Sequence, residues 1–240
     1  MSTHAWRGNW NGRTPAGEPH QRARNVISPS GGIMRGKFPS RKNGRMVHHE
    51  GMLEVDAIYL FELSRNVVAY REQATPVHYT DGARSRKYTP DFEVDLRSGA
   101  SLLIEVKPEF FANSPETKHK LQCIHAHMDR VEQTFLVLTE QSLRQQPRQT
   151  NLRAIYHQAD RLPPTEALVA NAMARIRDQF PLNVRAANAL LEPLGINACS
   201  LLTAGVVGCN VSAPFSLETD LYLLEEADHE WFWIAQEHRL

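Results

Sequence analysis

The chain is poor in cysteine and contains no long apolar run. Its 240 residues include three cysteines, Cys123, Cys199 and Cys209, which show no paired spacing. Isolated cysteines favour a reducing compartment, where disulfides are rare. No stretch approaches the roughly 20 apolar residues of a membrane span, and residues 1–8 lack the apolar segment of a signal peptide. We therefore expect a cytoplasmic protein with no membrane partner.

The chain also lacks net charge, but its charges are unevenly distributed. Residues 1–45 hold nine Arg or Lys side chains against Glu18 alone, a net charge of +8, so the rest of the chain carries −8. Residues 1–32 are rich in Gly, Pro, Asn and Ser and include Arg7, Arg13, Arg22 and Arg24. We expect them to form a basic arm without a core of its own. Such an arm favours a polyanionic partner such as DNA; the alternative is a solubilising tail.

Two neighbouring segments carry the most informative pattern: Tyr88-Thr89-Pro90-Asp91-Phe92 and Leu103-Ile104-Glu105-Val106-Lys107. Side chains alternate between the two faces of a strand, so Glu105 and Lys107 share one face while Leu102, Ile104 and Val106 point into a core. Polar residues and Gly99 lie between the segments and favour a turn. The sequence thus predicts a hairpin that places Asp91 next to Glu105.

These side-chain types in this arrangement are what metal-dependent phosphodiester hydrolysis requires. Two carboxylates can hold a hard divalent cation through oxygen. An ammonium group beside them, here Lys107, can steady an attacking hydroxide or a charged transition state. The alternative is that Glu105 and Lys107 are simply the solvated face of a strand.

A helix upstream can supply a further carboxylate. We expect it to begin near His49, because Leu53, Ala57, Leu60 and Phe61 form one apolar stripe. Three acidic residues are candidates: Glu50, Glu54 and Glu62. Glu54 is favoured because it lies in mid-helix beside the stripe that must face the sheet, whereas Glu62 is expected to be a surface charge.

Five motifs in order carry a family resemblance, and they cover roughly residues 33–140. They are Arg35-Gly36-Lys37-Phe38-Pro39-Ser40-Arg41-Lys42, His48-His49-Glu50-Gly51-Met52-Leu53-Glu54, Val68-Ala69-Tyr70-Arg71-Glu72-Gln73, Tyr88-Thr89-Pro90-Asp91-Phe92 and Ile104-Glu105-Val106-Lys107-Pro108. Together they resemble the N-terminal catalytic domain of the TnsA family. These proteins are the endonuclease subunits of heteromeric cut-and-paste transposases, and they belong to the restriction-endonuclease-like PD-(D/E)XK class.

The resemblance implies a function and a set of site residues. Glu54, Asp91 and Glu105 correspond to metal-binding carboxylates and Lys107 to the catalytic lysine. We expect the Val106 carbonyl to add a ligand, and the cofactor to be Mg²⁺ or Mn²⁺, with two ions per site. The implied substrate is double-stranded DNA at transposon ends, cut at the 5′ ends and paired with 3′ cuts by a DDE-type transposase subunit. The implied location is the prokaryotic cytoplasm, at the nucleoid.

Two other functions stay open at this point. One is an autonomous restriction- or repair-type PD-(D/E)XK endonuclease, which needs the same residues. The other is a non-catalytic DNA-bridging adaptor with a nuclease fold, which is disfavoured because all four candidate residues are present. Gln73 also falls on a family position; it has no evident chemical role, and we expect it to be structural.

The segment after Lys107 predicts a helix and a strand. Ser114-Pro115 is a typical helix start, and an apolar face with Ile124 and Met128 follows. Residues 134–139 predict a buried strand, and the order of elements predicts an α/β fold with a restriction-endonuclease-like mixed sheet flanked by helices. Cys123, His125 and His127 suggest zinc, but no second ligand pair follows at structural-site spacing. A surface or DNA-facing role is therefore favoured for these histidines.

We expect a domain boundary near residue 162, which gives a nuclease domain at 33–162 and a small, mainly helical, winged-helix-like domain at 163–240. Helical patterns cover residues 165–180, 182–194 and 197–204, and short β segments follow. Residues 165–240 carry four basic and ten acidic side chains, a net charge of −6, which favours a protein partner over DNA. The resemblance implies that this partner is a regulatory transposition ATPase. The aromatic tail with Trp231 and Trp233 is either an anchor for that partner or part of the domain's own core.

Overall fold

The computed structural model describes residues 34–82, 84–224 and 230–240. The expected basic arm, residues 1–32, lies outside the described residues. The chain divides into two units. The first contains the described residues up to Ile58 and Val67–Leu143, and the second contains Tyr59–Asn66 with the described residues of Arg144–Leu240.

The first unit contains both strands and helices. In chain order they are β1 (Arg35–Ser40), β2 (Arg45–Glu50), α1 (Met52–Leu63, whose last residues belong to the second unit), β3 (Val67–Glu72), β4 (Val77–Asp81), β5 (Arg84–Tyr88), β6 (Phe92–Leu96), β7 (Ser101–Val106), α2 (Glu109–Ala112), α3 (Pro115–Arg130), β8 (Phe135–Leu138) and α4 (Glu140–Leu143).

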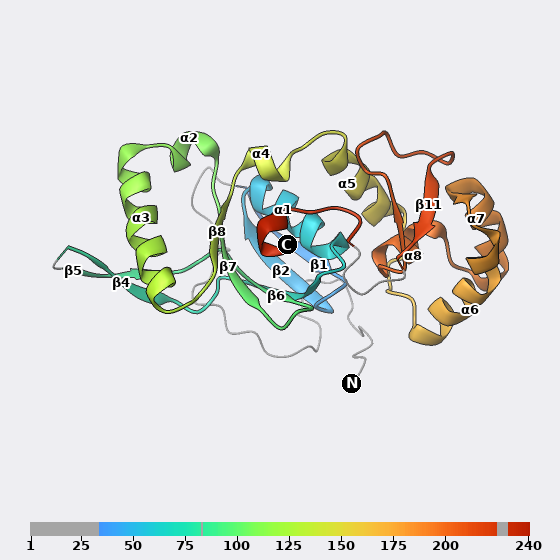
Figure 1. The fold of residues 1–240 in the computed structure, drawn as a ribbon, viewed down its shortest axis with the longest axis horizontal. Coiled ribbons are helices and arrows are strands. Elements are labelled where there is room, and N and C mark those ends of the chain that lie inside the picture. Colours follow the sequence, from blue (N-terminus) through green and yellow to red (C-terminus); the bar gives the residue numbers. More distant parts are fainter. Residues whose placement is uncertain (1–33, 83, 225–229) are drawn as a thin grey trace. The chain divides into compact units, whose positions relative to one another are not determined.

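A mixed four-stranded sheet forms the centre of this unit. Its strand order is β3-β6-β7-β8; β3, β6 and β7 are antiparallel neighbours, and β8 is parallel to β7. The connection from β7 to β8 runs through α2 and α3, as a parallel pair requires. In Figure 1, α3 and the β4–β5 hairpin lie on one side of these strands and the start of α1 lies on the other. The expected mixed sheet flanked by helices is confirmed.

The strand that carries Glu105 is buried on both faces, which disfavours the alternative of a solvated strand face. Every residue from Leu102 to Val106 is buried. Leu103, on the same face as Glu105, packs in a cluster with Tyr79 and Tyr88 from the hairpin and Ile124 from α3. The hairpin and α3 thus cover the face that the alternative interpretation would leave open to solvent. Glu105 therefore lies in a largely apolar setting.

A second hairpin, β1–β2, is tied to the sheet by a buried ion pair. The Arg45 guanidinium on β2 donates to both carboxylate oxygens of Glu72 on β3, over 2.9 and 2.6 Å. The His48 backbone N–H donates to the same carboxylate at 3.2 Å. Such a bidentate pair has fixed geometry, so it positions β2, and with it the start of α1, against the edge of the sheet.

The second unit is mainly helical. Its elements are α5 (Arg148–Gln158), α6 (Glu166–Ile176), η1 (Arg177–Gln179), β9 (Leu182–Asn183), α7 (Val184–Leu191), η2 (Glu192–Leu194), α8 (Ala198–Thr203), β10 (Val207–Cys209), β11 (Asp220–Leu223) and η3 (Gln236–His238). The three short strands form an antiparallel sheet in the order β10-β11-β9. The three expected helices and two expected β segments are present. A winged-helix assignment for them stays a prediction.

The division of the chain differs from the expected boundary near residue 162, because residues 144–162 belong to the second unit. Helix α5 explains this division. Its Leu152 and Ile155 are fully buried, and the Asn151 amide donates to the backbone carbonyls of Val211 and Ala213 at 2.9 and 2.7 Å.

The aromatic tail packs within its own unit. Trp231 and Phe232 are buried, and the Trp231 indole N–H donates to the Leu63 carbonyl at 3.1 Å. The Glu230 carboxylate accepts from the Ser64 hydroxyl and the Asn66 backbone N–H. Core packing, one of the two alternatives for the tail, therefore holds for Trp231, whereas Trp233 is only partly buried.

Candidate active site

The strand register brings Asp91 beside the end of β7. Asp91 directly precedes β6, and Phe92 at the start of β6 pairs with Ile104 on β7. Because the two strands are antiparallel, the residue before Phe92 lies level with the residues after Ile104. The Val106 backbone N–H accordingly donates to Asp91 Oδ2 at 2.9 Å. This bond fixes the carboxylate and leaves Oδ1 for another partner.

The Glu105 carboxylate is held from two directions. The Tyr88 hydroxyl at the end of β5 donates to Glu105 Oε2 at 2.6 Å. The Lys107 ammonium lies 3.3 Å from Glu105 Oε1, and its side chain is partly exposed while that of Glu105 is buried. Glu105 and Lys107 therefore share a face as expected, and a buried carboxylate is joined to an ammonium group that reaches solvent.

Glu54 lies in the first turn of α1 and is buried. Its Oε2 accepts a hydrogen bond from the Glu50 backbone N–H at 2.8 Å. The expected helix start near His49 is wrong, because His49 and Glu50 end strand β2 and Gly51, at φ +93°, turns the chain into the helix. Glu50 instead pairs with Arg35 at 3.1 Å. Glu62 is buried, so its expected role as a surface charge is also wrong.

The electrostatics of these carboxylates are coupled. Burial raises the pKa of Asp91 well above its usual value, and the negative charges of Glu105 and Glu54 raise it further. The hydrogen bond from Val106 and the charge of Lys107 oppose this increase. Burial and the neighbouring Glu105 also raise the pKa of the Tyr88 hydroxyl, so it stays a hydrogen-bond donor. Three carboxylates thus concentrate negative charge around Asp91.

This donor set fits a hard divalent cation. All three side chains offer carboxylate oxygens, which Mg²⁺ and Mn²⁺ prefer. A cation would relieve the repulsion that raises the pKa of Asp91. Glu54, Asp91 and Glu105 would hold it. Among the described residues, one other group of potential ligands is packed more tightly. Its three ligand atoms, from Asp81, His119 and Cys123, all lie within 4.8 Å of one another.

Two residues around the site were assigned no chemistry from the sequence. Gln73 is buried at φ +52°, and its backbone N–H donates to the Asp91 carbonyl at 2.8 Å, so it anchors the backbone that presents Asp91. Tyr88 lies in the same motif as Asp91 and orients Glu105. The only sequence signal for the role of Tyr88 in orienting Glu105 was its position two residues before Pro90.

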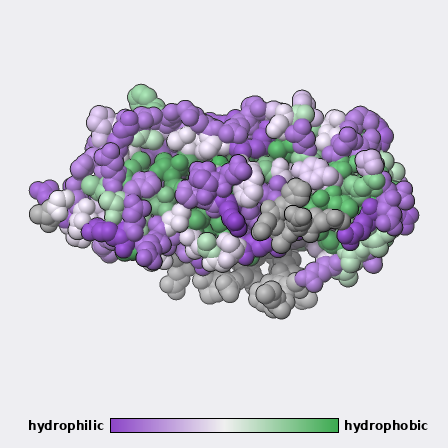
Figure 2. Space-filling model, viewed as in Figure 1, coloured by the Kyte–Doolittle hydropathy of each residue, from purple (hydrophilic) through white to green (hydrophobic). Residues whose placement is uncertain are grey.

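An exposed aromatic pair follows Lys107 closely. Phe110 and Phe111 on α2 are 82% and 55% exposed, and their rings meet edge to face. Figure 2 shows the corresponding apolar patch over α2, surrounded by hydrophilic residues. No sequence pattern predicted exposed phenylalanines beside the site.

The comparison with protein families identifies the domain that contains most of these residues. Residues 64–140 match a family model described as TnsA-like endonuclease N terminal. The chain carries a TnsA-like endonuclease domain. The match includes Asp91, Glu105 and Lys107, whereas Glu54 lies before it. The comparison with curated proteins gives no match.

The TnsA-like domain makes this protein a nuclease, and therefore a hydrolase, related to subunits of the Tn7 transposase. The match spans 77 of the 240 residues and ends before most of α4, so it does not cover most of the second unit. Among the described residues, no helix is both long and apolar enough to cross a membrane.

Proposed function

We propose that this protein is the DNA endonuclease subunit of a heteromeric transposase, which hydrolyses phosphodiesters at the 5′ ends of a transposon with Mg²⁺ or Mn²⁺. The observation that carries the proposal is the joint placement of Asp91 and Glu105 at adjacent strand ends with Lys107 beside them, inside the TnsA-like domain. The expected DDE-type transposase subunit would make the 3′ cuts.

Each side chain has a separate task in this proposal. Glu54, Asp91 and Glu105 would hold two ions, and the Val106 carbonyl would add a ligand. When bound, the metal stabilises charge on the phosphate and makes water a better nucleophile at neutral pH. Lys107, 3.3 Å from Glu105, orients the attacking water and offsets the charge that develops on the phosphate. The Tyr88 hydroxyl keeps Glu105 in one rotamer, which preserves the geometry of the ligands.

A basic surface beside the site supports duplex DNA as the substrate. Arg84, Arg86 and Lys87 on β5 are exposed, as are Lys118 and Lys120 on α3. The ammonium group of Lys120 lies 5.0 Å from the centre of the Tyr88 ring, the ring whose hydroxyl holds Glu105. Phosphates bound by these side chains would thus lie next to the candidate catalytic residues.

The second unit is proposed to bind a regulatory ATPase. Exposed acidic side chains, among them Glu166, Glu192 and Glu218, disfavour contact with DNA. An apolar cavity of about 450 Å³ lies between the start of α6 and the end of α8 and offers a place for a protein side chain. Its lining includes Pro164, Val169 and Val206. This cavity replaces the buried aromatic tail as the candidate contact.

A cleavage assay tests the function. Transposon-end DNA is incubated with the full chain, the transposase subunit, the ATPase and Mg²⁺. We expect 5′ strand cutting that stops on chelation and falls by orders of magnitude in Asp91→Asn. Asp129→Asn is the matched control, because Asp129 is exposed on α3 and should cut like the wild type. Equal cutting by both variants would refute the role of Asp91.

The same assay separates the two other functions. Cutting of DNA without partners would favour an autonomous restriction- or repair-type endonuclease. Stable bridging of DNA without cutting, under conditions where calorimetry detects bound Mg²⁺, would favour a non-catalytic adaptor. The calorimetry is needed because absence of cutting alone would not distinguish an adaptor from a subunit without its metal.

A further inference from the structure

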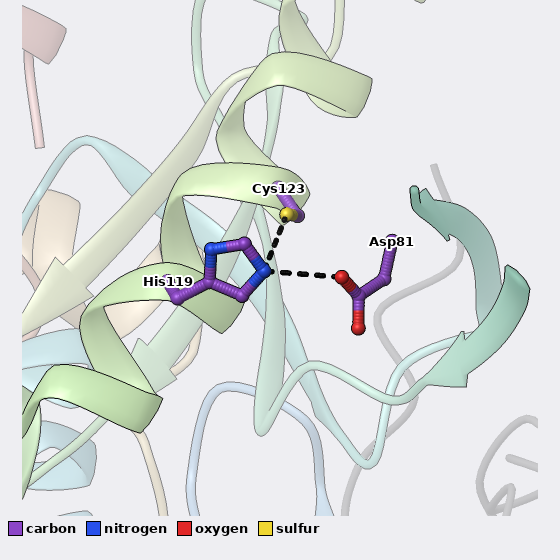
Figure 3. Close-up of side chains that lie close together, drawn as sticks. All are labelled: Asp81, His119 and Cys123. Carbon is purple, nitrogen blue, oxygen red and sulfur yellow. Dashed lines mark hydrogen bonds and ion pairs between the residues drawn. The ribbon is translucent and has the colours of Figure 1, made fainter. Parts of the chain in front are cut away.

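A cluster of three different metal-binding side chains lies apart from the candidate nuclease residues. Asp81 ends strand β4, and His119 and Cys123 lie four residues apart on α3, so they share one face of the helix. Figure 3 shows the three side chains converging from the hairpin and the helix. In the sequence, Cys123 with His125 and His127 suggested zinc, but a surface or DNA-facing role was favoured for these histidines. In the structure Cys123 instead faces His119, and the His125 ring packs against Phe135.

The distances within the cluster are close to those between the ligands of one metal ion. Asp81 Oδ1 lies 3.0 Å from His119 Nε2, and Cys123 Sγ lies 3.7 Å from the same nitrogen. All three ligand atoms fall within 4.8 Å of one another. Ligands bound at about 2.0–2.3 Å to a tetrahedral zinc ion are separated by roughly 3.3–3.7 Å. The cluster therefore needs only small side-chain adjustments to surround one ion.

A simple ion pair does not account for the whole arrangement. Pairing with Asp81 explains the position of the His119 ring, but the Cys123 thiol points at the same nitrogen. One N–H cannot be donated well to two acceptors, and a protonated Nε2 has no lone pair for the thiol. A metal ion beside Nε2 would satisfy the imidazole, the thiolate and the carboxylate together.

The surroundings hold the carboxylate in place and leave the cluster accessible. The Arg86 guanidinium binds Asp81 Oδ2 at 3.2 Å, which turns Oδ1 toward His119. Carboxylates that bind metals are commonly fixed by such a second hydrogen bond. The His119 side chain is 66% exposed, so an ion can reach the cluster from solvent.

We propose that Asp81, His119 and Cys123 form a binding site for a zinc-class divalent ion that fastens the end of the β4–β5 hairpin to α3. Soft thiolate and imidazole ligands select Zn²⁺ over Mg²⁺, in contrast to the all-oxygen carboxylates around Asp91. The fastened hairpin carries Tyr88, which contacts Glu105, and exposed basic residues. This site does not depend on the proposed transposase function.

Cobalt titration of the reduced, metal-free full chain tests the site. We expect one equivalent of Co²⁺ to give a thiolate-to-cobalt charge-transfer band, which an equivalent of Zn²⁺ abolishes. Cys123→Ser should remove the band, and His119→Gln and Asp81→Asn should weaken Zn²⁺ affinity at least tenfold, measured by competition with a chromogenic chelator. His127→Gln, on the same helix but outside the cluster, should behave like the wild type.

Two further measurements guard against misinterpretation. Asp81→His replaces one metal ligand with another and should retain Zn²⁺ binding. Retained binding would show that the position tolerates substitution, so that weakened binding in Asp81→Asn reports the loss of a ligand. Hydrogen exchange in residues 77–82 and 84–88 should slow when Zn²⁺ is added to the wild type and not in Cys123→Ser. No charge-transfer band, or a band that persists in Cys123→Ser, would overturn the proposal, even if the protein cleaves DNA as proposed.

Discussion

The buried carboxylates of the first unit and the surface carboxylates of the second unit act in opposite ways. In the first unit, Glu54, Glu72 and Glu105 are buried, and each carboxylate accepts a hydrogen bond from a defined donor. In the second unit, acidic residues such as Glu218 are exposed and pair in water with exposed partners. Burial makes a carboxylate costly unless it is paired, so buried carboxylates indicate geometry that the fold maintains. Exposed ones mainly set the electrostatic potential that a partner meets.

The largest expected difference between a charge at the candidate site and a charge on the surface is the effect of Lys107 on the rate of strand cutting. Removing its ammonium group in Lys107→Ala should lower the rate of strand cutting by about 10²–10³-fold, comparable to the removal of a transition-state hydrogen-bond donor. Mg²⁺ binding measured by calorimetry should persist, because an ammonium group is not a cation ligand. Arg130→Ala, which removes an exposed basic side chain at the end of α3, is the control and should cut normally. Abolished Mg²⁺ binding in Lys107→Ala would indicate a structural role.

The second effect concerns stability. Glu72→Ala leaves the Arg45 guanidinium buried without its carboxylate, and this should lower the free energy of unfolding by about 3–5 kcal/mol. Glu218→Ala breaks the exposed pair with Arg185 and should cost about 1 kcal/mol or less. Urea unfolding of both variants measures the difference. Similar decreases in both would mean that burial does not distinguish the two ion pairs.

A smaller effect follows from the raised pKa of Asp91. The folded protein then binds a proton more tightly than the unfolded chain, so the contribution of Asp91 to stability in the metal-free protein is largest at low pH. It should fall as pH rises from the ordinary value of 3.8 through the raised pKa. Asp91→Asn should flatten this part of the stability curve, and saturating Mg²⁺ should do the same in the wild type. If stability depends on pH in the same way in Asp91→Asn as in the wild type, Asp91 is not the source of this pH dependence.

Local patterns predicted the strands but not what covers them. Alternation and the polar turn before Ser101 located β6 and β7, and the order of Asp91, Glu105 and Lys107 indicated the candidate site. Burial of the Glu105 face depends on Tyr79, Tyr88 and α3, which are distant in sequence, so period-two reasoning could not detect it. The start of α1 was missed because Gly51 adopts a positive φ that its sequence neighbours do not reveal.

The cluster at the hairpin end illustrates the same limit. His119 and Cys123 have the spacing of neighbours on a helix, so half of the pattern was present in the sequence. Asp81 lies 38 positions earlier than His119 and meets it only because β4 packs against α3. A helical face can be predicted from spacing, but the side chain that completes it depends on the tertiary fold.

The smallest effect concerns DNA affinity, where exposed charge acts through counterion release. Arg84 and Lys87 are exposed on β5, the strand that ends at Tyr88. Replacing both with Ala should reduce the slope of log K against log salt by about 0.9 for each duplex phosphate that the variant no longer neutralises. The matched control replaces Arg161 and Arg175, which are exposed in the acidic second unit, and should leave the slope unchanged. Fluorescence anisotropy with transposon-end duplex at several salt concentrations measures both. If the control lowers the slope as much as the β5 variant does, the second unit also contacts DNA, and the proposed division of roles between the units is wrong.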